Sequence, residues 1–353
     1  MKVLFVYKYL TLGGVEAVLR ARLDGLGALG IETHAWFFHD YGGRAIFEGL
    51  KERTHVGSVE GCLLFAREAG FDLLCSIDTE EILPGLAEGP ERPKLVFECH
   101  SAYLENITYL RDLARHPPAA VFTPSEVQRE IVRERLGPEI EVRVVPNPLR
   151  QEFVEEPCPF PSPPPRPVLA WIGRLDAQKN WEGFVELLGL LVRAGTPVEG
   201  WMVGRHVQDE EKARFQKRAR EEKALGRLRW FGALPSCRIH VLLDAVRDSG
   251  GVLVSTSRGE SFGLTVAEAM ARRCAVVVPD QRPFTEFVEE GVSGSLFRPG
   301  SPESAADRVR ELLGDAARRR EYGRRGRETI LARFAPEPAL AVLARELGLL
   351  TAR

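Results

Sequence analysis

The chain has 353 residues, of which 44% are hydrophobic and 28% charged, as is typical of a globular protein with two domains. Its net charge is −2, but residues 1–160 carry 17 basic and 25 acidic side chains, which argues against nucleic acid or anionic lipid as a partner of this part. No apolar run approaches the ~18 residues of a membrane span, and the run after Lys2 is too short for a signal peptide. We therefore expect a soluble, cytoplasmic protein without a transmembrane segment. Peripheral membrane contact and the oligomeric state stay open.

The six cysteines are widely spaced and include no C-x-x-C pair. This pattern predicts reduced, mostly buried thiols in the cytoplasm and indicates neither a disulfide framework nor a zinc site. The cysteines are Cys62, Cys75, Cys99, Cys158, Cys237 and Cys274.

A proline-rich segment, residues 155–167, divides the chain. Because proline fixes φ and lacks a backbone donor, the segment is predicted to be a stiff, extended linker. Before it, short apolar runs predict strands at Val3–Tyr7, Thr33–Phe38, Leu73–Ile77, Leu95–Glu98, Val121–Thr123 and Val142–Val145. Stretches of helical period between them predict helices at Val15–Leu29, Gly61–Ala69 and Ser125–Leu136.

The same rhythm follows the linker. Strands are predicted at Val168–Ile172, Val198–Val203, Leu228–Phe231, Val252–Ser255 and Ala275–Val278. Helices are predicted at Trp181–Ala194, Glu210–Leu225, Ile239–Arg247 and Leu264–Arg272. The alternation predicts an α/β protein with two facing Rossmann-like domains. Since such sheets bind ligands at the carboxyl ends of their strands, we expect the site in an interdomain cleft.

Two candidate features lie before the linker. The turn containing Gly13 and Gly14 follows the first strand and opens a helix, so its backbone amides can approach an anion. It is not a G-x-G-x-x-G motif and does not indicate a nicotinamide site; a plain tight turn is the alternative. His100 follows the strand Leu95–Glu98 at the same rim, and its alternative is a structural hydrogen bond.

The segment GRLDAQKN, residues 173–180, follows the first strand after the linker. Arg174 offers a forked array of donors and Lys179 a compact charge where a strand gives way to a helix. This pair suits two phosphates, and the alternative is a solvated turn with ordinary surface cations.

The segment SRGESFGLTVAE, residues 257–268, carries the strongest signal. Glu260 and Glu268 form the pattern E-x7-E, with Glu260 in a loop after a strand and Glu268 about one turn into a helix. Carboxylates accept hydrogen bonds from pairs of hydroxyls, so a ribose and a sugar are natural partners. Gly263 and the helix start offer amides to phosphates between them. The alternatives are a solvated helix residue and a charge favoured by the helix dipole.

Five motifs follow one another over nearly the whole chain: the Gly-Gly turn, V-V-P-N-P, G-R-L-D-x-x-K-N, V-G-R and G-E-S-F-G-L-T-V-A-E. In this order they resemble the motifs of glycosyltransferase family 4. Its members belong to the "glycosyl transferases group 1" and are retaining enzymes of the GT-B fold. The resemblance implies an N-terminal acceptor domain at 1–158 and a C-terminal donor domain at 159–335. A helix at about 336–353 is expected to pack back on the first.

The resemblance also implies the chemistry: transfer of a sugar from a nucleotide-diphosphate sugar, most simply a UDP-sugar, to a polysaccharide, glycolipid or small-molecule acceptor. It implies no cofactor and no metal, and the sequence has no D-x-D motif. The implied catalytic residues are His100, Arg174, Lys179 and Glu260. The implied donor-binding residues are Gly13, Gly14, Gly173, Arg174, Lys179, Gly204, Arg205, Phe231, Leu234, Glu260, Ser261, Phe262, Gly263, Leu264 and Glu268.

Two segments depart from the family pattern. Residues 280–286, DQRPFTE, lack the Gly-Gly that often precedes Glu286, which affects the surroundings of the donor sugar. Val203-Gly204-Arg205-His206 lacks a second glycine, which affects the base pocket. A nucleotide-sugar epimerase or hydrolase and a non-catalytic nucleotide-sugar-binding protein are the alternative functions.

Overall fold

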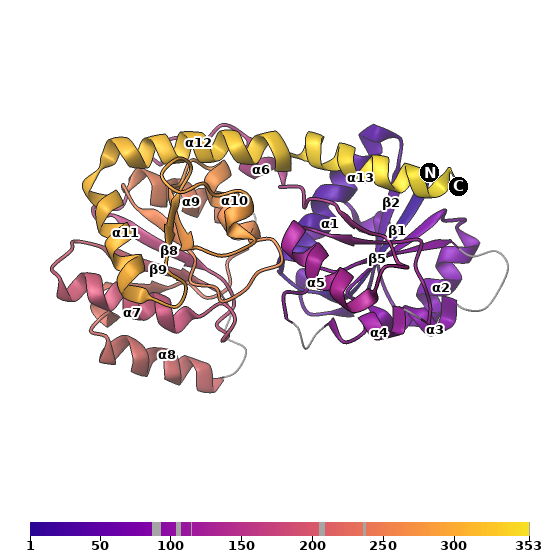
Figure 1. Cartoon of the computed structure of the whole chain (residues 1–353), viewed down its shortest axis with the longest axis horizontal. Coiled ribbons are helices and arrows are strands. Elements are labelled where there is room, and N and C mark those ends of the chain that lie inside the picture. Colours follow the sequence, from indigo (N-terminus) through magenta and orange to yellow (C-terminus); the bar gives the residue numbers. More distant parts are fainter. Residues whose placement is uncertain (87–92, 104–106, 114, 205–208, 236–237, 353) are drawn as a thin grey trace. The chain divides into compact units, whose positions relative to one another are not determined.

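The computed structural model describes residues 1–353 except 87–92, 104–106, 114, 205–208, 236–237 and 353 (Figure 1). The chain divides into two compact units. The first comprises Met1–Gln151 and Arg333–Arg353, and the second comprises Glu152–Ala332. The division falls before the proline-rich segment, which therefore belongs to the second unit.

The first unit is built on a parallel sheet of seven strands in the order β3-β2-β1-β4-β5-β6-β7. Its strands are β1 (Lys2–Leu10), β2 (Glu32–Asp40), β3 (Thr54–Val56), β4 (Leu73–Ile77), β5 (Lys94–Glu98), β6 (Ala120–Thr123) and β7 (Val142–Val144). Its α-helices are α1 (Gly14–Gly25), α2 (Val59–Glu68), α3 (Leu83–Leu86), α4 (Leu110–Leu113), α5 (Glu126–Leu136) and α13 (Pro336–Thr351). The short 3-10 helices are η1 (Leu26–Leu29), η2 (Gly43–Phe47), η3 (Lys51–Arg53) and η4 (Glu80–Ile82).

Alternation along β1 gives this sheet a core on each face. Val3 and Phe5 join one apolar cluster, and Leu4 and Val6 join another. Both faces are covered, as expected of a parallel sheet built from βαβ units. The C-terminal helix α13 completes the first of these cores with Leu340, Leu343, Leu347 and Leu350.

The second unit holds a parallel sheet of six strands in the order β10-β9-β8-β11-β12-β13. Its strands are β8 (Val168–Ile172), β9 (Glu199–Val203), β10 (Leu228–Trp230), β11 (Val252–Val254), β12 (Val276–Pro279) and β13 (Ser295–Phe297). Its α-helices are α7 (Trp181–Arg193), α8 (Asp209–Glu221), α9 (Ile239–Asp248), α10 (Leu264–Ala271), α11 (Pro302–Gly314) and α12 (Ala316–Phe334), which extends just past the unit's end. The helix α6 (Gln151–Val154) lies at the division, and η6 (Leu225–Arg227) and η8 (Phe284–Glu286) are 3-10 helices.

The predicted α/β class with two parallel sheets is confirmed, and the strands predicted on each side of the proline-rich segment are present. The prediction missed β3 and β13, which lie at sheet edges and have three residues each. It also left out α11 and α12, the second of which is rich in arginine along its whole length.

The described cysteines Cys62, Cys75, Cys99, Cys158 and Cys274 are free thiols, and Cys158 alone among these five is exposed. Cys237 lies outside the described residues. In the described part of the chain, the apolar stretches within helices are all too short or too polar to traverse a bilayer.

Candidate functional site

The predicted phosphate and sugar residues of the second unit meet at one place in its sheet. Strands β8 and β11 are neighbours although β9 and β10 separate them in sequence, so the strand order reverses between them. The loop after β8 carries Lys179, and the loop after β11 carries Glu260. Ligands of open α/β sheets bind at such a switch point.

A salt bridge joins the two loops there. The Lys179 Nζ atom lies 2.6 Å from Glu260 Oε1, and Ser257 Oγ donates to the same oxygen at 2.8 Å. Both charged side chains are mostly buried, with exposed fractions of 21% for Lys179 and 12% for Glu260. An ammonium has three donors, so its bond to Glu260 leaves it capacity for phosphate oxygens.

Neutral hydrogen bonds fix the two loops against each other. The Arg258 amide donates to the Gln178 carbonyl at 2.8 Å, and Gln178 Nε2 donates back to Gly259 O at 3.1 Å. Beneath them, Trp171 Nε1 of β8 donates to Thr256 Oγ1 at 3.0 Å. These bonds hold the Lys179–Glu260 pair in a fixed geometry, which lowers the reorganisation needed when a ligand arrives.

The E-x7-E segment has the predicted geometry. Gly263 caps α10 with φ of 90°, and a Cβ there would approach Phe284 Cε1 to 2.8 Å, so both conformation and space require glycine. Leu264 is the first residue of α10, and Glu268, only 7% exposed, lies in its second turn. Phe262 is buried and packs on Phe287 with ring centroids 5.9 Å apart. Ser261 precedes Phe262 and is half-buried.

Arg174 lies on the same loop as Lys179 but is more accessible. Its side chain is 59% exposed, and its Nε lies 3.2 Å from Asp176 Oδ2. Asp176 Oδ1 in turn accepts the Lys179 amide at 2.8 Å, so this carboxylate orders both cationic residues.

Gly204 directly follows β9, the strand beside β8 in the sheet. A Cβ at Gly204 would lie 1.7 Å from the Gly173 carbonyl oxygen, so only glycine lets the end of β9 approach the turn after β8. This packing requirement accounts for Gly204 independently of any ligand.

Three further residues were predicted to bind the donor. Phe231 is 39% exposed and packs edge-on against Trp201, and Leu234 is half-buried. Arg205 lies outside the described residues.

In the first unit, the strand order reverses between β1 and β4, and Gly13 and Gly14 follow β1 at this point. Glu16 turns back toward them: its Oε1 accepts the Thr11 amide and hydroxyl, each at 2.5 Å. Burial raises the pKa of Glu16, while these bonds and the Gly13 amide act in the opposite direction. A carboxylate of the chain itself therefore contacts amides of this turn, a feature the sequence analysis missed. Phosphate binding by Gly13 and Gly14 stays a prediction.

His100 belongs to a buried charged network at the end of β5. Its Nε2 lies 3.0 Å from Glu98 Oε2, and Arg22 Nη1 of α1 contacts both oxygens of Glu98 at 2.8 and 2.9 Å. Burial alone raises the pKa of Glu98, but Arg22 and His100 outweigh it and hold that pKa at about 2. An ionised Glu98 is an acceptor for Nε2 of His100, so the carboxylate fixes the orientation of the imidazole ring.

Asp78 fixes His100 from the other side, at the end of β4. Its Oδ1 accepts the His100 amide at 3.0 Å and the Tyr109 hydroxyl, and its own φ is 43°. Burial raises the pKa of Asp78 against the opposing effect of His100 and these bonds. Of this network only His100 was predicted, because Arg22, Asp78 and Tyr109 lie on separate elements and belong to no local motif.

Across the ranges that the structure describes, histidine, cysteine, aspartate and glutamate side chains do not gather in groups of three or more that could hold a metal ion.

Known proteins share sequence and fold with this chain. Residues 155–329 match the family model "Glycosyl transferases group 1". Over 180 residues the chain is 32% identical to a sucrose synthase of Acidithiobacillus caldus, an alignment covering 48% of this chain and 23% of the relative. Over 189 residues it is 26% identical to the alpha-D-kanosaminyltransferase of Streptomyces kanamyceticus, covering 52% and 47%. The chain thus spans less than half the length of these two relatives.

Solved structures are similar over the whole chain. The structure of Anabaena Alr3699/HepE in complex with UDP and glucose has a TM-score of 0.83 at 19% identity, with 99% of each chain covered. Sucrose-phosphate synthase from Thermosynechococcus elongatus has a TM-score of 0.80 at 19% identity, with 100% of each covered. The protein therefore has the GT-B fold. Residues 155–329, which lie within its second unit, are the part that matches the group 1 family model.

Proposed function

We propose that this protein is a retaining, metal-independent glycosyltransferase of family 4 that uses a nucleotide-diphosphate sugar, with a UDP-sugar as the first candidate donor. The observation that carries the proposal is the Lys179–Glu260 pair, 2.6 Å apart at the switch point of the second sheet. The match of residues 155–329 to the group 1 family and the fold shared with a UDP complex support it.

The chemistry follows from the charges. Lys179 and Arg174 hold the diphosphate and stabilise the negative charge that develops as it leaves. Glu260 accepts hydrogen bonds from hydroxyls of the donor sugar, and Glu268 from those of the ribose. The acceptor is a polysaccharide, a glycolipid or a small molecule. Its hydroxyl oxygen bonds to the anomeric carbon on the face where the bond to the diphosphate breaks, and an oxygen of the leaving diphosphate takes the hydroxyl proton, so the configuration is retained. The family resemblance adds His100, held by Glu98 and Asp78, as a residue that we propose acts on the donor sugar.

The test is a thermal-shift screen of the purified protein with UDP, GDP, ADP, TDP and their common sugar conjugates, without added metal. A ligand that binds only the folded state raises Tm, because it adds to the free energy of unfolding. At a ligand concentration of 100 times Kd this stabilisation is ~2.7 kcal/mol. We expect a clear rise with UDP and its sugars. A rise with another nucleotide family would reassign the donor, and no rise with any would refute the proposal.

Turnover separates transfer from the alternative functions. A donor that binds and is consumed only when an acceptor is present identifies a transferase, and the anomeric signals of the product in NMR spectra report retention. Consumption in water alone would identify a hydrolase. Interconversion of the free nucleotide sugar would identify an epimerase, and binding without consumption a non-catalytic protein.

Replacing Glu268 with alanine is expected to weaken UDP binding about 10- to 100-fold, because a hydrogen bond to a charged group contributes ~1.5–3 kcal/mol. Isothermal titration calorimetry with UDP measures this directly. Glu311→Ala, an exposed glutamate on α11, is the control and should leave Kd unchanged. Equal affinities of the Glu268→Ala variant and the wild type would exclude the ribose contact.

Chelation tests the metal-free mechanism. Because Lys179 and Arg174 supply the positive charge at the leaving group, excess EDTA is expected to leave the initial rate of sugar transfer unchanged. Rates are compared before and after EDTA, and again after adding Mg²⁺ or Mn²⁺. A rate abolished by EDTA and restored by either ion would overturn this part of the proposal.

A further inference from the structure

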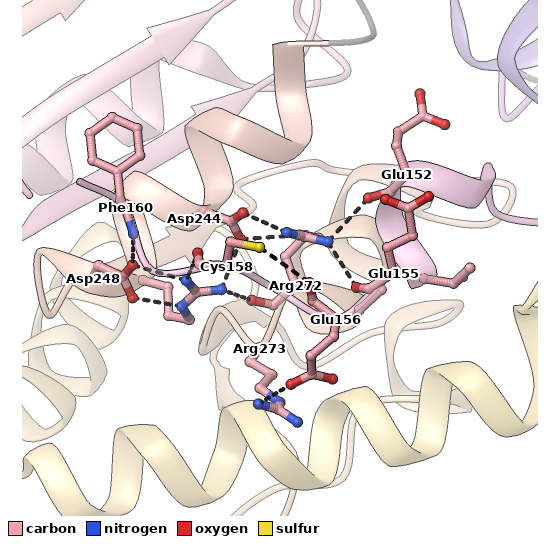
Figure 2. A network of polar contacts seen from close by, with 12 residues as sticks. Glu152, Glu155, Glu156, Cys158, Phe160, Asp244, Asp248, Arg272 and Arg273 are labelled. Carbon is pink, nitrogen blue, oxygen red and sulfur yellow. Dashed lines mark hydrogen bonds and ion pairs between the residues drawn. The ribbon is translucent and has the colours of Figure 1, made fainter. Parts of the chain in front are cut away.

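The helix that begins at the candidate donor site ends in a cluster of arginines (Figure 2). Arg272 directly follows α10 and is only 3% exposed. Its amide donates to the carbonyl of Glu268 at 3.1 Å, so the backbone of the predicted ribose-binding residue and that of Arg272 belong to one helical turn. A displacement of this turn displaces Glu268 with it.

The guanidinium of Arg272 binds in two directions. Its Nε and Nη2 donate to the carboxylate of Asp244 on α9, at 3.0 and 2.5 Å. Its Nη1 donates to the carbonyl oxygens of Glu152 and Glu155, at 3.1 and 2.9 Å. These two residues belong to the connecting segment, which we define as residues 152–160, the first residues of the second unit.

Further arginines hold the same segment. Arg247 of α9 donates to Cys158 O at 2.8 Å and to Arg272 O at 3.1 Å. Arg327 of α12 donates to Val154 O at 2.6 Å and also bonds the carbonyl of Ala271, the last residue of α10. The carbonyls at the end of α10 and those of the connecting segment are therefore bound by the same side chains.

Two aspartates offset part of the positive charge of these arginines. Asp244 also accepts Arg247 Nη1 at 2.8 Å, and Asp248 Oδ2 accepts the amide of Phe160 at 2.6 Å. Arg272 contacts α10 through its amide, and α9 and the connecting segment through its guanidinium. Its planar fork of donors is required for this, since a lysine ammonium cannot reach a carboxylate and two carbonyls in the same geometry.

We infer that Arg272 is a positioning residue that couples occupancy of the donor site to the connecting segment through α10. The inference rests on the proposed function, since it takes Glu268 as a donor contact. Coupling between two sites is reciprocal. A ligand that orders Glu268 must therefore stabilise the connecting segment, and loosening the segment must weaken the ligand.

The first measurement is hydrogen–deuterium exchange of the whole protein, with and without saturating UDP, followed in peptides covering residues 152–160. The Phe160 amide is bonded to Asp248 and exchanges only when the segment opens. We expect exchange in these peptides to slow at least threefold with UDP. In Arg272→Gln, the exchange of the segment should be fast and no longer respond to UDP.

The second measurement is the Kd of UDP for Arg272→Gln, Arg272→Lys and Arg273→Gln. Arg273 is the matched control: it is the adjacent arginine and also contacts the connecting segment, but only through an exposed ion pair, 2.6 Å from Glu156. Because 44% of the Arg273 side chain and 64% of the Glu156 side chain are exposed, this pair should contribute little to holding the segment. We expect Kd to rise about tenfold in both Arg272 variants and less than twofold in Arg273→Gln. The lysine variant keeps the charge beside Asp244, so it tests the fork of donors if the glutamine variant fails to fold.

The outcomes separate the two proposals. If the wild-type protein binds no nucleotide diphosphate, the proposed function is wrong. If it binds UDP but Arg272→Lys binds UDP equally well and the exchange of residues 152–160 does not respond, the proposed function stands and the positioning role of Arg272 is overturned. A loss of stability without a change in UDP affinity identifies Arg272 as a structural residue only.

Discussion

Lys179→Ala is expected to lower the rate of sugar transfer about 10²- to 10³-fold. Removing one preorganised donor to a developing anion costs ~2.7–4 kcal/mol in transition-state stabilisation. The structure adds a second effect: the side chain of Glu260 is only 12% exposed, and in the variant it stays buried without its cation. We expect the loss mainly in kcat, since the charge on the diphosphate grows as the glycosidic bond breaks.

Initial rates over a range of donor concentrations give this result, with Lys217→Ala as the control. Lys217 lies on α8 in the same unit, is 77% exposed and meets Glu221 only at 3.9 Å, so its removal should leave the rate within twofold. A Lys179→Ala enzyme with an unchanged kcat would exclude this side chain from the leaving-group step.

Arg22→Met is expected to destabilise the first unit by about 3–5 kcal/mol, because it leaves the carboxylate of Glu98 buried without its cation. Both side chains are at most 1% exposed, so water cannot replace the lost partner. Urea denaturation measures the change, and hydrogen exchange of peptides containing β5 assigns it to this unit.

Arg44→Met provides the control for this experiment. Arg44 also pairs with a carboxylate in the first unit, Asp40, but its side chain is 66% exposed, and the loss should stay below about 1 kcal/mol. If Arg22→Met unfolds no more easily than Arg44→Met, the pair with Glu98 contributes nothing to the fold.

The Arg22–Glu98 pair also determines how stability depends on pH. The folded pKa of Glu98 is about 2, below its ordinary value of 4.5, so the native state favours the ionised form. Its contribution is complete above the ordinary pKa and is lost as the pH falls from 4.5 toward 2. Glu98→Gln should therefore show a flatter decline of unfolding free energy over this range than the wild type.

Local patterns in the sequence predicted the elements of the second unit that carry the candidate site, although they missed β13, α11 and α12. The loops after β8 and β11, the cap at Gly263 and the place of Glu268 in α10 each depend on a few adjacent residues, and the structure has them as predicted. The pairing of Lys179 with Glu260 was not predicted, because the two residues are 81 positions apart and meet only when β8 and β11 become neighbours.

The first unit shows the opposite case. His100 was identified by its place at the end of a strand, but its partners Arg22, Asp78 and Tyr109 come from α1, the end of β4 and the segment before α4. A charged residue on a helix is usually solvated, so a buried Arg22 has no signature in the sequence. Only the packing of α1 on the sheet takes this side chain out of water.

By itself, the sequence determined the α/β class, the two parallel sheets and the loops that carry the candidate donor site, because hydrophobic periodicity and glycine placement act over a few residues. The tertiary structure decided which side chains are paired. It brought Lys179 to Glu260, buried Arg22 against Glu98, turned Glu16 onto the Gly13 turn and joined Arg272 to the connecting segment. These contacts depend on strand order and helix packing, and the energy of a buried charge is set by the partner that the whole fold places beside it.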